Sequence, residues 1–509
     1  MRSRVVAAAV AVLATFIWGV GSASARSEFV TSFDGTKINV NFFPTDATAS
    51  GKRAPTVLFG PGWGQAGAKD PEATTDVTIG AIGVGTLRAA GYNVLTWDPR
   101  GFGDSGGVVQ VDSPKAEALD VQALVSYVAK QPEAKLDHKG DPRVGMTGAS
   151  YGGGIQLSAA ALDRRIDVIV PDIAWHSLTT SLYKDSTFKA GWGTLLYTLG
   201  KVAGTLDPHI DSAAMSGETT GKISKEDEAW FRSRGPGDLV KKIKVPTLLI
   251  QGTVDTLFTL DEAITNYRIL SHSGVPVKML WFCGGHGGCL TDPGDPERVD
   301  EATIAWLDRW LARDKSVRTG PGFDWINQDG EQFTAKRYPK KHTTLEASGK
   351  GSLPLTQAGG SGPSKPGPGA VGALAGITNG TKALNAVNVE VPGKGHDRQV
   401  VGIPKLALTY SGNASAADVR VFAQLVDDDT DTVLGNQVTP IPLELDGKKH
   451  ELKRPLEAVA HTLRPGSGVT LQITSSATNY GPQRATGLVD FKRIDVKLPV
   501  IKAAAKKRK

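Results

Sequence analysis

The chain has 509 residues, which is long enough for two ordinary domains with sizeable cores. Its net charge of +6 is local, because Arg2, Arg4 and the basic residues among positions 502–509 account for the excess and leave a body close to neutral. We do not expect nucleic acid as a partner, because the chain is expected to be exported and its nearly neutral body has no basic, aromatic face.

The amino-terminal segment has the pattern of a secretory signal peptide. Residues 1–4 read MRSR, residues 5–20 are largely apolar and residues 22–25 read SASA, so cleavage is expected after Ala25. An uncleaved membrane anchor is the alternative, although the apolar run is short for a span. We therefore expect residues 1–25 to be a signal peptide and the mature protein to be secreted or otherwise extracytoplasmic.

Residues 27–318 alternate strand-like runs with helical stretches, which predicts an α/β domain with a doubly wound, mostly parallel sheet. An early strand at residues 55–59 runs into the glycine-rich segment 60–64, which reads GPGWG. A later strand at residues 92–97 leads into DPRGFGDS at 98–105, interpreted as a rigid loop that braces the site rather than reacts.

The most informative stretch is residues 148–152, which read GASYG and match G-x-S-x-G. A strand-like run precedes it, and small, helix-compatible residues follow it. Strand, sharp turn and helix are the context of a nucleophile elbow, in which the two glycines let neighbouring backbones pass close by. We therefore predict an α/β-hydrolase domain with Ser150 as its nucleophile.

Hydrolases with this elbow carry the acid and then the histidine after later strands. Asp255 follows the apolar run 245–252, and His286 follows the strand at 277–282. His286 would take the hydroxyl proton of the serine and pass it to the leaving group, while Asp255 would fix the imidazole tautomer.

Two other residues lie near the same strand ends. Asp172 follows the apolar strand 166–171 and is a rival for the role of the acid. His176 is the other histidine in this region, and the remaining histidines are expected at the surface.

A tetrahedral intermediate also needs donors for its oxyanion. One is expected from the backbone N–H of Tyr151, the residue after the nucleophile. The second is assigned to the backbone N–H of Trp63, because segment 60–64 follows an earlier strand and its glycines allow close approach. An ordinary turn at the strand end is the alternative for this segment.

Between about residues 175 and 244 the strand pattern lapses, which predicts a helical cap over the active site. Its large apolar side chains include Trp192, Leu195, Leu196, Tyr197, Trp230 and Phe231. They either line a pocket for an acyl or aromatic group or pack the cap against its domain.

Cys283 and Cys289 flank His286 on one loop, and an oxidising compartment permits a disulfide between them. Such a bond would restrict the loop that carries the imidazole. Two free thiols or metal binding are the alternatives, but a single nearby histidine leaves a zinc site short of ligands. We expect the disulfide, no metal and no cofactor.

From residue 319 to residue 500 the pattern changes to short alternating strands, which predicts an all-β sandwich with a Gly/Pro-rich loop at about 357–370. The acidic run 427–431 is expected to be a solvated hairpin turn rather than a calcium site, because it lacks the glycine and glutamate of an EF-hand loop. Residues 501–509 form a basic tail that either contacts the cell envelope or is a disordered, solubilising end.

Taken together, these motifs resemble the X-Pro dipeptidyl-peptidase/cocaine-esterase-like branch of the α/β-hydrolases. The matching pieces are DPRG at 98–101 with Gly103 and Ser105, Gly148 to Gly153, VPT at 245–247 through Gly252 with Asp255, and GGH at 284–286. The resemblance implies a jelly-roll sandwich after the hydrolase domain. Some relatives use a tyrosine phenol in the oxyanion hole, whereas segment 60–64 has none.

The sequence thus predicts a secreted serine hydrolase that cleaves an ester or amide bond of a small-molecule ester, acyl compound or short peptide through an acyl-enzyme. A carboxylesterase is favoured over an X-Pro dipeptidyl-peptidase, because no pocket for a free amino terminus can be identified. The alternatives are an acyltransferase to a sugar or lipid hydroxyl and a non-catalytic surface binding protein.

Overall fold

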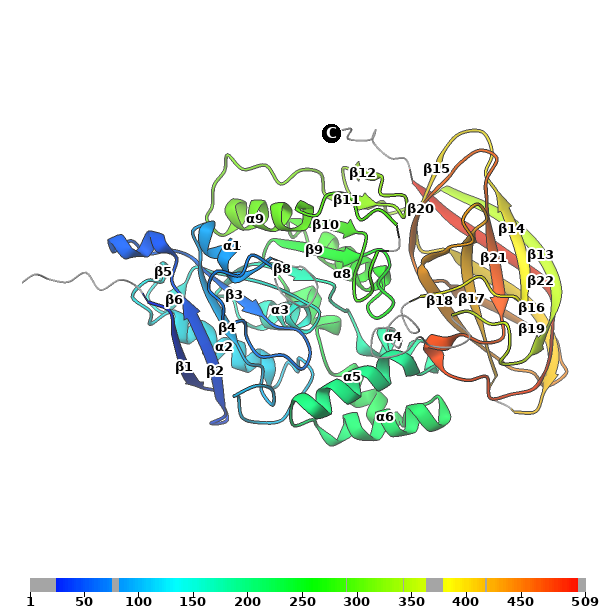
Figure 1. The fold of residues 1–509 in the computed structure, drawn as a ribbon, viewed down its shortest axis with the longest axis horizontal. Coiled ribbons are helices and arrows are strands. Elements are labelled where there is room, and N and C mark those ends of the chain that lie inside the picture. The colour runs from blue at the N-terminus through cyan, green and yellow to red at the C-terminus, as the bar shows by residue number, and fades with distance from the viewer. Residues whose placement is uncertain are drawn as a thin grey trace, which may run out of the picture.

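The computed structural model describes residues 24–75, 82–289, 291–341, 343–362, 379–416 and 419–501. Within these ranges an α/β domain is followed by an antiparallel β-sandwich (Figure 1). Residues 1–23 of the predicted signal peptide, residues 363–370 of the Gly/Pro-rich loop and residues 502–509 of the basic tail lie outside the described residues. Where the chain is described, its helices are too short or too polar to span a membrane.

A sheet of ten described strands forms the centre of the α/β domain. Their order across the sheet is β1 (Arg26–Thr31), β2 (Lys37–Phe43), β4 (Asn93–Trp97), β3 (Thr56–Gly60), β7 (Val144–Ala149), β8 (Ile166–Asp172), β9 (Thr247–Gly252), β10 (Val277–Phe282), β11 (Phe323–Ile326) and β12 (Gln332–Ala335). Neighbouring strands from β4 to β11 run parallel, and the outer pairs are antiparallel. A parallel sheet of this kind requires crossover connections, which place helices on its faces.

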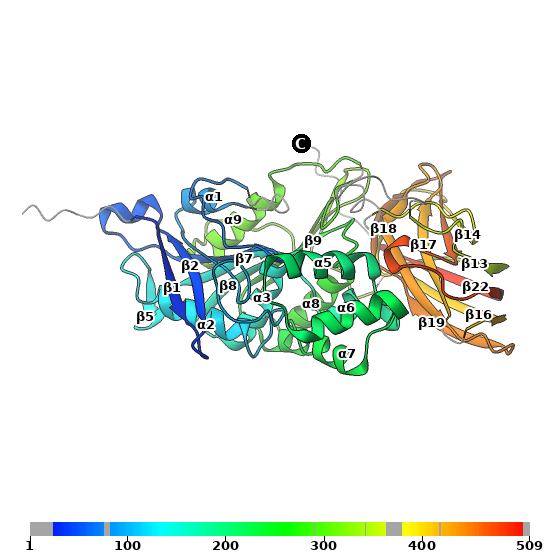
Figure 2. The same ribbon diagram turned by 60° about the horizontal axis from the view of Figure 1, so that its bottom comes forward.

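Helices cover both faces of this sheet (Figures 1 and 2). One face packs against α2 (Glu117–Val128), α3 (Tyr151–Leu162) and α8 (Leu260–His272), and the other packs against α1 (Val84–Ala89) and α9 (Arg298–Trp310). Side chains alternate along β3, so that Leu58 joins the first core while Val57 and Phe59 join the second. Both faces of the central strands are therefore buried.

The segment between β8 and β9 is a helical cap. It contains α4 (Leu178–Ser181), η2 (Lys184–Ser186), α5 (Ala190–Ala203), α6 (Pro208–Thr220), α7 (Lys225–Arg232) and η3 (Gly237–Lys242). Local sequence sets the ends of α6, because the Asp207 side chain accepts the His209 N–H, Pro208 takes the first turn and Gly221 ends the helix at φ 75°. Figure 2 shows α5, α6 and α7 close to one another on one side of the molecule.

Two antiparallel sheets form the sandwich, drawn in yellow-green to red in Figure 1. The larger one contains β19 (His450–Pro455), β16 (Lys405–Ala414), β22 (Gly487–Ile501), β15 (Arg398–Gly402), β20 (Val459–Leu463) and β13 (Thr343–Leu355), and the smaller one β14 (Ala386–Pro392), β21 (Gly468–Thr474), β17 (Val419–Asp427) and β18 (Val433–Leu443). Inward-facing residues such as Leu406 and Leu408 alternate with more exposed ones and fill the core between the sheets. The acidic run 427–431 lies at the turn between β17 and β18, as predicted.

The predicted start of the sandwich at residue 319 was wrong. β11 pairs in parallel with β10, and β12 pairs with β11, so both strands belong to the hydrolase sheet and the sandwich begins with β13. Phe323 stacks on Trp325 and contacts Trp281 of β10 inside that core. Residue alternation identified these strands but carries no information about which sheet they join.

The remaining described elements are short. They are η1 (Asp46–Ser50), the hairpin strands β5 (Leu136–His138) and β6 (Asp141–Pro142), and η4 (Thr478–Tyr480).

Candidate active site

Ser150 stands at the tip of a strained turn between β7 and α3. Its backbone adopts φ 56° and ψ −114°, a region that few residues other than glycine occupy. The flanking glycines are required by the close approach of β3, since a Cβ atom would lie 2.5 Å from the Gly60 carbonyl oxygen at Gly148 and 2.0 Å from it at Gly152. The Ser150 N–H donates to the Asp172 carbonyl oxygen at 2.9 Å, which fixes the turn to β8.

His286 and Asp255 lie next to Ser150 in a continuous hydrogen-bonded chain. His286 Nε2 is 2.7 Å from Ser150 Oγ, and His286 Nδ1 is 2.7 Å from Asp255 Oδ2. The other carboxylate oxygen of Asp255 accepts the N–H groups of Leu257 and Phe258, each at 2.9 Å. Asp255 is fully buried and the His286 side chain is 13% exposed, so solvent barely reaches the chain of bonds.

The loop that carries His286 is shaped by its glycines and by its cysteines. Gly285 adopts φ 129°, and a Cβ atom there would lie 2.5 Å from Asp255 Cβ, so only glycine lets the loop pass. Cys283 and Cys289 form a disulfide across this loop, six residues apart. The bond closes the segment around His286 and limits its freedom.

Aromatic rings hold the imidazole from two sides. The indole of Trp192, from α5 of the cap, meets His286 edge to face with 5.8 Å between centroids. The ring of Phe258 does the same from the β9–α8 loop at 5.2 Å. Such pairs restrict rotation of the imidazole and shield its bond to Asp255 from water.

The rival residues lie elsewhere. Asp172 is buried beneath the elbow, and burial raises the pKa of its carboxyl to about 7, with the charge of Asp255 adding to the shift. Because Nδ1 of His286 is already bonded to Asp255, Asp172 does not take the position of the acid. His176 is bonded through Nδ1 to Asn266 at 2.8 Å, on the α8 side of the cap.

Tyr151 and Trp63, the two residues predicted to supply oxyanion donors, both line a cavity beside Ser150. Tyr151 begins α3, and its N–H belongs to the first helical turn, where no intrahelical acceptor exists. Trp63 lies on the loop after β3, and its ring meets that of Tyr151 edge to face at 5.3 Å. Its indole N–H donates to the Leu196 carbonyl oxygen of the cap, so the side chain is fixed. Donation by its backbone N–H stays a prediction.

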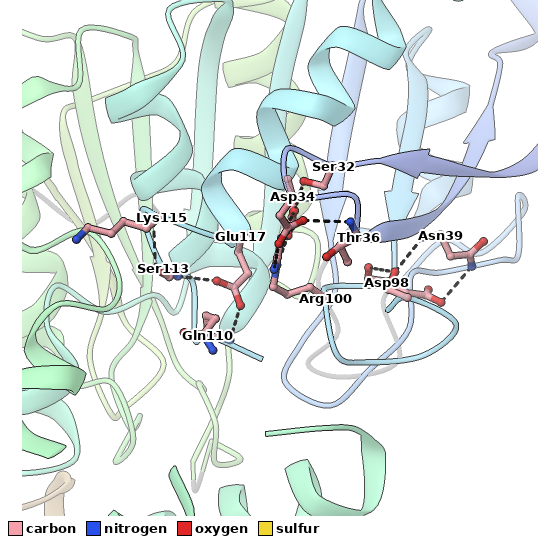
Figure 3. Close-up of polar contacts among 12 residues, drawn as sticks. Ser32, Asp34, Thr36, Asn39, Asp98, Arg100, Gln110, Ser113, Lys115 and Glu117 are labelled. Atoms are coloured by element: carbon pink, nitrogen blue, oxygen red, sulfur yellow. Dashed lines mark hydrogen bonds and ion pairs between the residues drawn. The ribbon is translucent and has the colours of Figure 1, made fainter. Parts of the chain in front are cut away.

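Hydrogen bonds to Asp98 hold the loop 98–105 in place. Asp98 accepts the N–H groups of Gly67 and Asp104, each at 2.8 Å, and the Asn39 amide at 3.0 Å. Gly67 follows the segment that contains Trp63, so its bond to Asp98 ties the predicted oxyanion loop to the loop 98–105. Figure 3 shows the bond between Asn39 and Asp98.

Ion pairs of Arg100 and hydrogen bonds to Glu117 fix the same region (Figure 3). The buried guanidinium of Arg100 pairs with Asp120 at 2.7 Å and with Asp34 at 2.9 Å. Glu117 accepts the N–H groups of Gln110 and Ser113, and burial raises the pKa of its carboxyl to about 7. These contacts tie the start of α2 to the loop and to the β1–β2 turn.

An apolar cavity of about 90 Å³ opens beside Ser150 under the cap. Its aromatic lining residues are Trp63, Tyr151, Trp175, Tyr183, Phe188, Tyr197, Phe231 and Phe258. Among the residues that the structure describes, the lining set includes no carboxylate, lysine or arginine. By volume the cavity suits an apolar group smaller than benzene, which an engineered apolar cavity of about 150 Å³ holds.

Sequence reasoning identified part of this lining. Leu196, Tyr197 and Phe231 line the cavity, in agreement with the interpretation that the apolar residues of the cap line a pocket. Trp192 instead contacts His286, and Trp230 stacks on His209 at 5.3 Å. The missed rings come from separate segments, and their convergence leaves no local signal in the sequence.

A possible ligand cluster lies on the sandwich, within the described part of the chain. Glu444, Asp446 and His450 place potential ligand atoms within 4.8 Å of one another. His450 Nε2 is already bonded to Asp446 at 2.7 Å, and Lys448 lies 3.2 Å from the same carboxylate. A neighbouring ammonium and an exposed position favour an ordinary surface ion pair, and we assign no metal here.

Two sequence comparisons bear on the identity of the chain. The family model described as X-Pro dipeptidyl-peptidase (S15 family) matches residues 34–288. A putative Xaa-Pro dipeptidyl-peptidase from Rhodopirellula baltica is 24% identical over 287 residues, which is 49% of this chain and 43% of that protein. An uncharacterized 31.7 kDa protein from Escherichia coli is 36% identical over 86 residues, 17% of this chain and 28% of its own length. The chain thus matches less than half the length of these curated relatives.

Solved structures share the fold over almost the whole length. An α-amino acid ester hydrolase superposes with a TM-score of 0.71 at 14% identity, covering 95% of this chain and 97% of that one. A CocE/NonD family hydrolase from Staphylococcus aureus superposes with a TM-score of 0.66 at 14% identity, covering 94% and 93%. The predicted fold class, an α/β-hydrolase domain followed by a β-sandwich, is confirmed.

Proposed function

Because the chain belongs to the X-Pro dipeptidyl-peptidase (S15) family and is therefore a serine hydrolase of ester or peptide bonds, we propose that it is an exported carboxylesterase. Ser150, His286 and Asp255 form the proposed catalytic triad. Family membership removes the non-catalytic binding protein as an alternative. The finer choice between ester and dipeptide depends on the pocket beside Ser150.

The proposed reaction proceeds through an acyl-enzyme. His286 Nε2 takes the proton of Ser150 Oγ as the oxygen attacks the carbonyl carbon of the ester. The negative charge on the former carbonyl oxygen is stabilised by the backbone N–H groups of Tyr151 and Trp63. The alcohol leaves with the proton of the imidazolium, and water then attacks the acyl group by the same route. Asp255 holds the imidazole and stabilises its charged form.

The single observation that favours an ester is the composition of the cavity. An X-Pro dipeptidase must take the ammonium group of its substrate out of water, which is costly without a carboxylate to pair with it. The described residues that line the cavity offer aromatic and aliphatic side chains and no carboxylate. An acyl group needs no charged partner and gains free energy when its methylenes are buried.

Export is supported by two features. The sequence of residues 1–25 has the organisation of a secretory signal peptide. Cys283 and Cys289 are joined by a disulfide, a bond that persists in oxidising compartments. Contact of the basic tail with the cell envelope remains a prediction from sequence.

The test compares two substrates at equal concentration. We expect kcat/KM for a short-chain p-nitrophenyl ester to exceed that for Gly-Pro-p-nitroanilide. Acetylation of the amino group of the dipeptide serves as the control for an ammonium site. Dominant release from the dipeptide that disappears on acetylation would replace the esterase by a dipeptidase.

A further inference from the structure

The sandwich contacts the loop that carries Asp255. β18 leaves its regular pairing with β17 between Val433 and Val438, where the ladder register shifts. In this bulge Gly435 and Asn436 adopt φ values of 63° and 56°. The bulge directs the strand toward the hydrolase domain, because a Cβ atom at Gly435 would lie 2.7 Å from the carbonyl oxygen of Thr253.

Gln437, which ends the bulge, bonds directly to the candidate catalytic acid. Its side-chain Nε2 donates to the Asp255 carbonyl oxygen at 2.8 Å and to the Gly435 carbonyl oxygen at 2.9 Å. Gln437 is 5% exposed and Asp255 is fully buried, so neither group exchanges this bond for water. The carbonyl belongs to the same residue whose carboxylate receives His286.

A second contact holds the far end of the same loop. Glu457, from the β19–β20 connection, accepts the Thr259 hydroxyl at 2.8 Å and pairs with Lys184 of the cap at 2.8 Å. The N–H of the next residue, Ala458, donates to Asp261 at 2.8 Å. Thr259 is the N-cap residue of α8, so the sandwich fixes the point at which the loop enters that helix.

The two contacts constrain the orientation of the Asp255 side chain. Asp255 Oδ1 accepts two N–H groups from its own loop, at Leu257 and Phe258, so the carboxylate follows the conformation of that loop. Fixing the loop at the Asp255 carbonyl and at Thr259 leaves it little freedom to turn the carboxylate away from His286.

We propose that Gln437 is a positioning residue for Asp255, so that the sandwich supplies part of the support of the active site. The inference rests on the proposed function, because it requires Asp255 to be the acid of the triad. Gln437 does not line the cavity beside Ser150, and its effect is expected on the chemical step rather than on substrate binding.

The test replaces Gln437 by methionine, which is similar in length but has no donor. We expect kcat for the ester to fall up to about 100-fold with little change in KM. The acidic limb of the kcat/KM profile should move to lower pH, because a carboxylate held less well stabilises the imidazolium of His286 less. If Gln437 had a purely structural role, Gln437→Met would lower the melting temperature but change neither kcat nor the acidic limb of the kcat/KM profile.

Gln424→Met is the matched control. Gln424 is a buried glutamine on the neighbouring strand β17, and its amide bonds to Thr381 and Gln472 within the sandwich. This variant should lose stability without a change in the pH profile. If Gln437→Met fails to fold, Gln437→Asn keeps the amide but shortens its reach, and the same shift in the acidic limb is expected.

The failure of this inference is distinguishable from that of the proposed function. Wild-type esterase activity that falls about 10⁴-fold in Asp255→Asn but is unchanged in Gln437→Met would overturn the positioning role alone. Absence of esterase activity from the folded wild type would overturn the proposed function itself.

Discussion

Asp255 holds His286 at two points, because its Oδ2 atom lies 2.7 Å from the imidazole Nδ1 and 3.2 Å from the backbone nitrogen of the same histidine. The second bond ties the carboxylate to the loop and not only to the ring. The carboxylate is therefore fixed relative to the backbone of His286 as well as to its ring.

The consequence is that Asp255→Asn should retain the geometry and lose most of the activity. An amide cannot stabilise an imidazolium as a carboxylate does and supports the wrong tautomer, so kcat should fall about 10⁴-fold, as at the corresponding residue of subtilisin. Asp172→Asn is the matched control, since it changes the other buried carboxylate near the elbow. Greater loss of kcat in Asp172→Asn than in Asp255→Asn would show that the acid is assigned to the wrong residue.

Asp172 should instead affect the pH dependence of stability. Its pKa is about 7 in the folded protein against an ordinary value of 3.8, so between about pH 4 and pH 7 the folded state binds more protons than the unfolded chain. Stability therefore falls as pH rises through this window, and the loss is complete above about pH 7. Asp172→Asn is neutral throughout, so its melting temperature should rise relative to the wild type between pH 5 and pH 8. If the melting temperatures of the two proteins changed with pH in the same way, the Asp172 carboxyl would not be buried and protonated.

Phe188 should set the acyl length that the cavity accepts. Its ring packs against two glycines. A Cβ atom at Gly193 would lie 2.2 Å from the ring, and one at Gly217 would lie 2.5 Å from it. Phe188→Ala should open space toward α6 and favour longer acyl chains, with a gain in kcat/KM of roughly fourfold for each further methylene buried, or about 0.8 kcal/mol. Gly217→Ala should push the ring into the cavity and favour acetate.

The measurement is kcat/KM over p-nitrophenyl esters from acetate to decanoate. Met215→Ala, at an exposed position on α6, which also carries Gly217, is the control and should leave the preference among the esters unchanged. Phe188→Leu replaces Phe188→Ala if the latter is too unstable. An unchanged optimum in folded Phe188 and Gly217 variants would mean that the acyl group binds elsewhere.

The sequence was sufficient to predict the residues that follow strands. Ser150, Asp255 and His286 each lie within a few residues of the end of a strand with a clear local pattern, and the roles proposed for them follow the order nucleophile, acid, histidine expected for this elbow. The fold class could be predicted for the same reason, since the alternation of strands and helices is local.

Features that depend on distant contacts could not be predicted. β11 has the alternation of a sandwich strand, but packing of Phe323 against Trp281 places it in the hydrolase sheet. Phe188 and Trp175 reach the cavity from separate parts of the cap, and no periodicity connects them. Gln437 reaches Asp255 across 182 positions of the chain, a contact that only the tertiary structure reveals.

The most direct test of the central claim is labelling of Ser150 by a fluorophosphonate probe. The hydroxyl lies 2.7 Å from His286 Nε2 at the edge of the cavity, so the folded wild-type protein should become covalently labelled, with the modified peptide containing Ser150. Ser150→Ala should abolish the label, and ester hydrolysis should fall about 10⁶-fold in kcat. Labelling that persists in Ser150→Ala, or that is absent from the folded wild type, would contradict the assignment of Ser150 as the nucleophile.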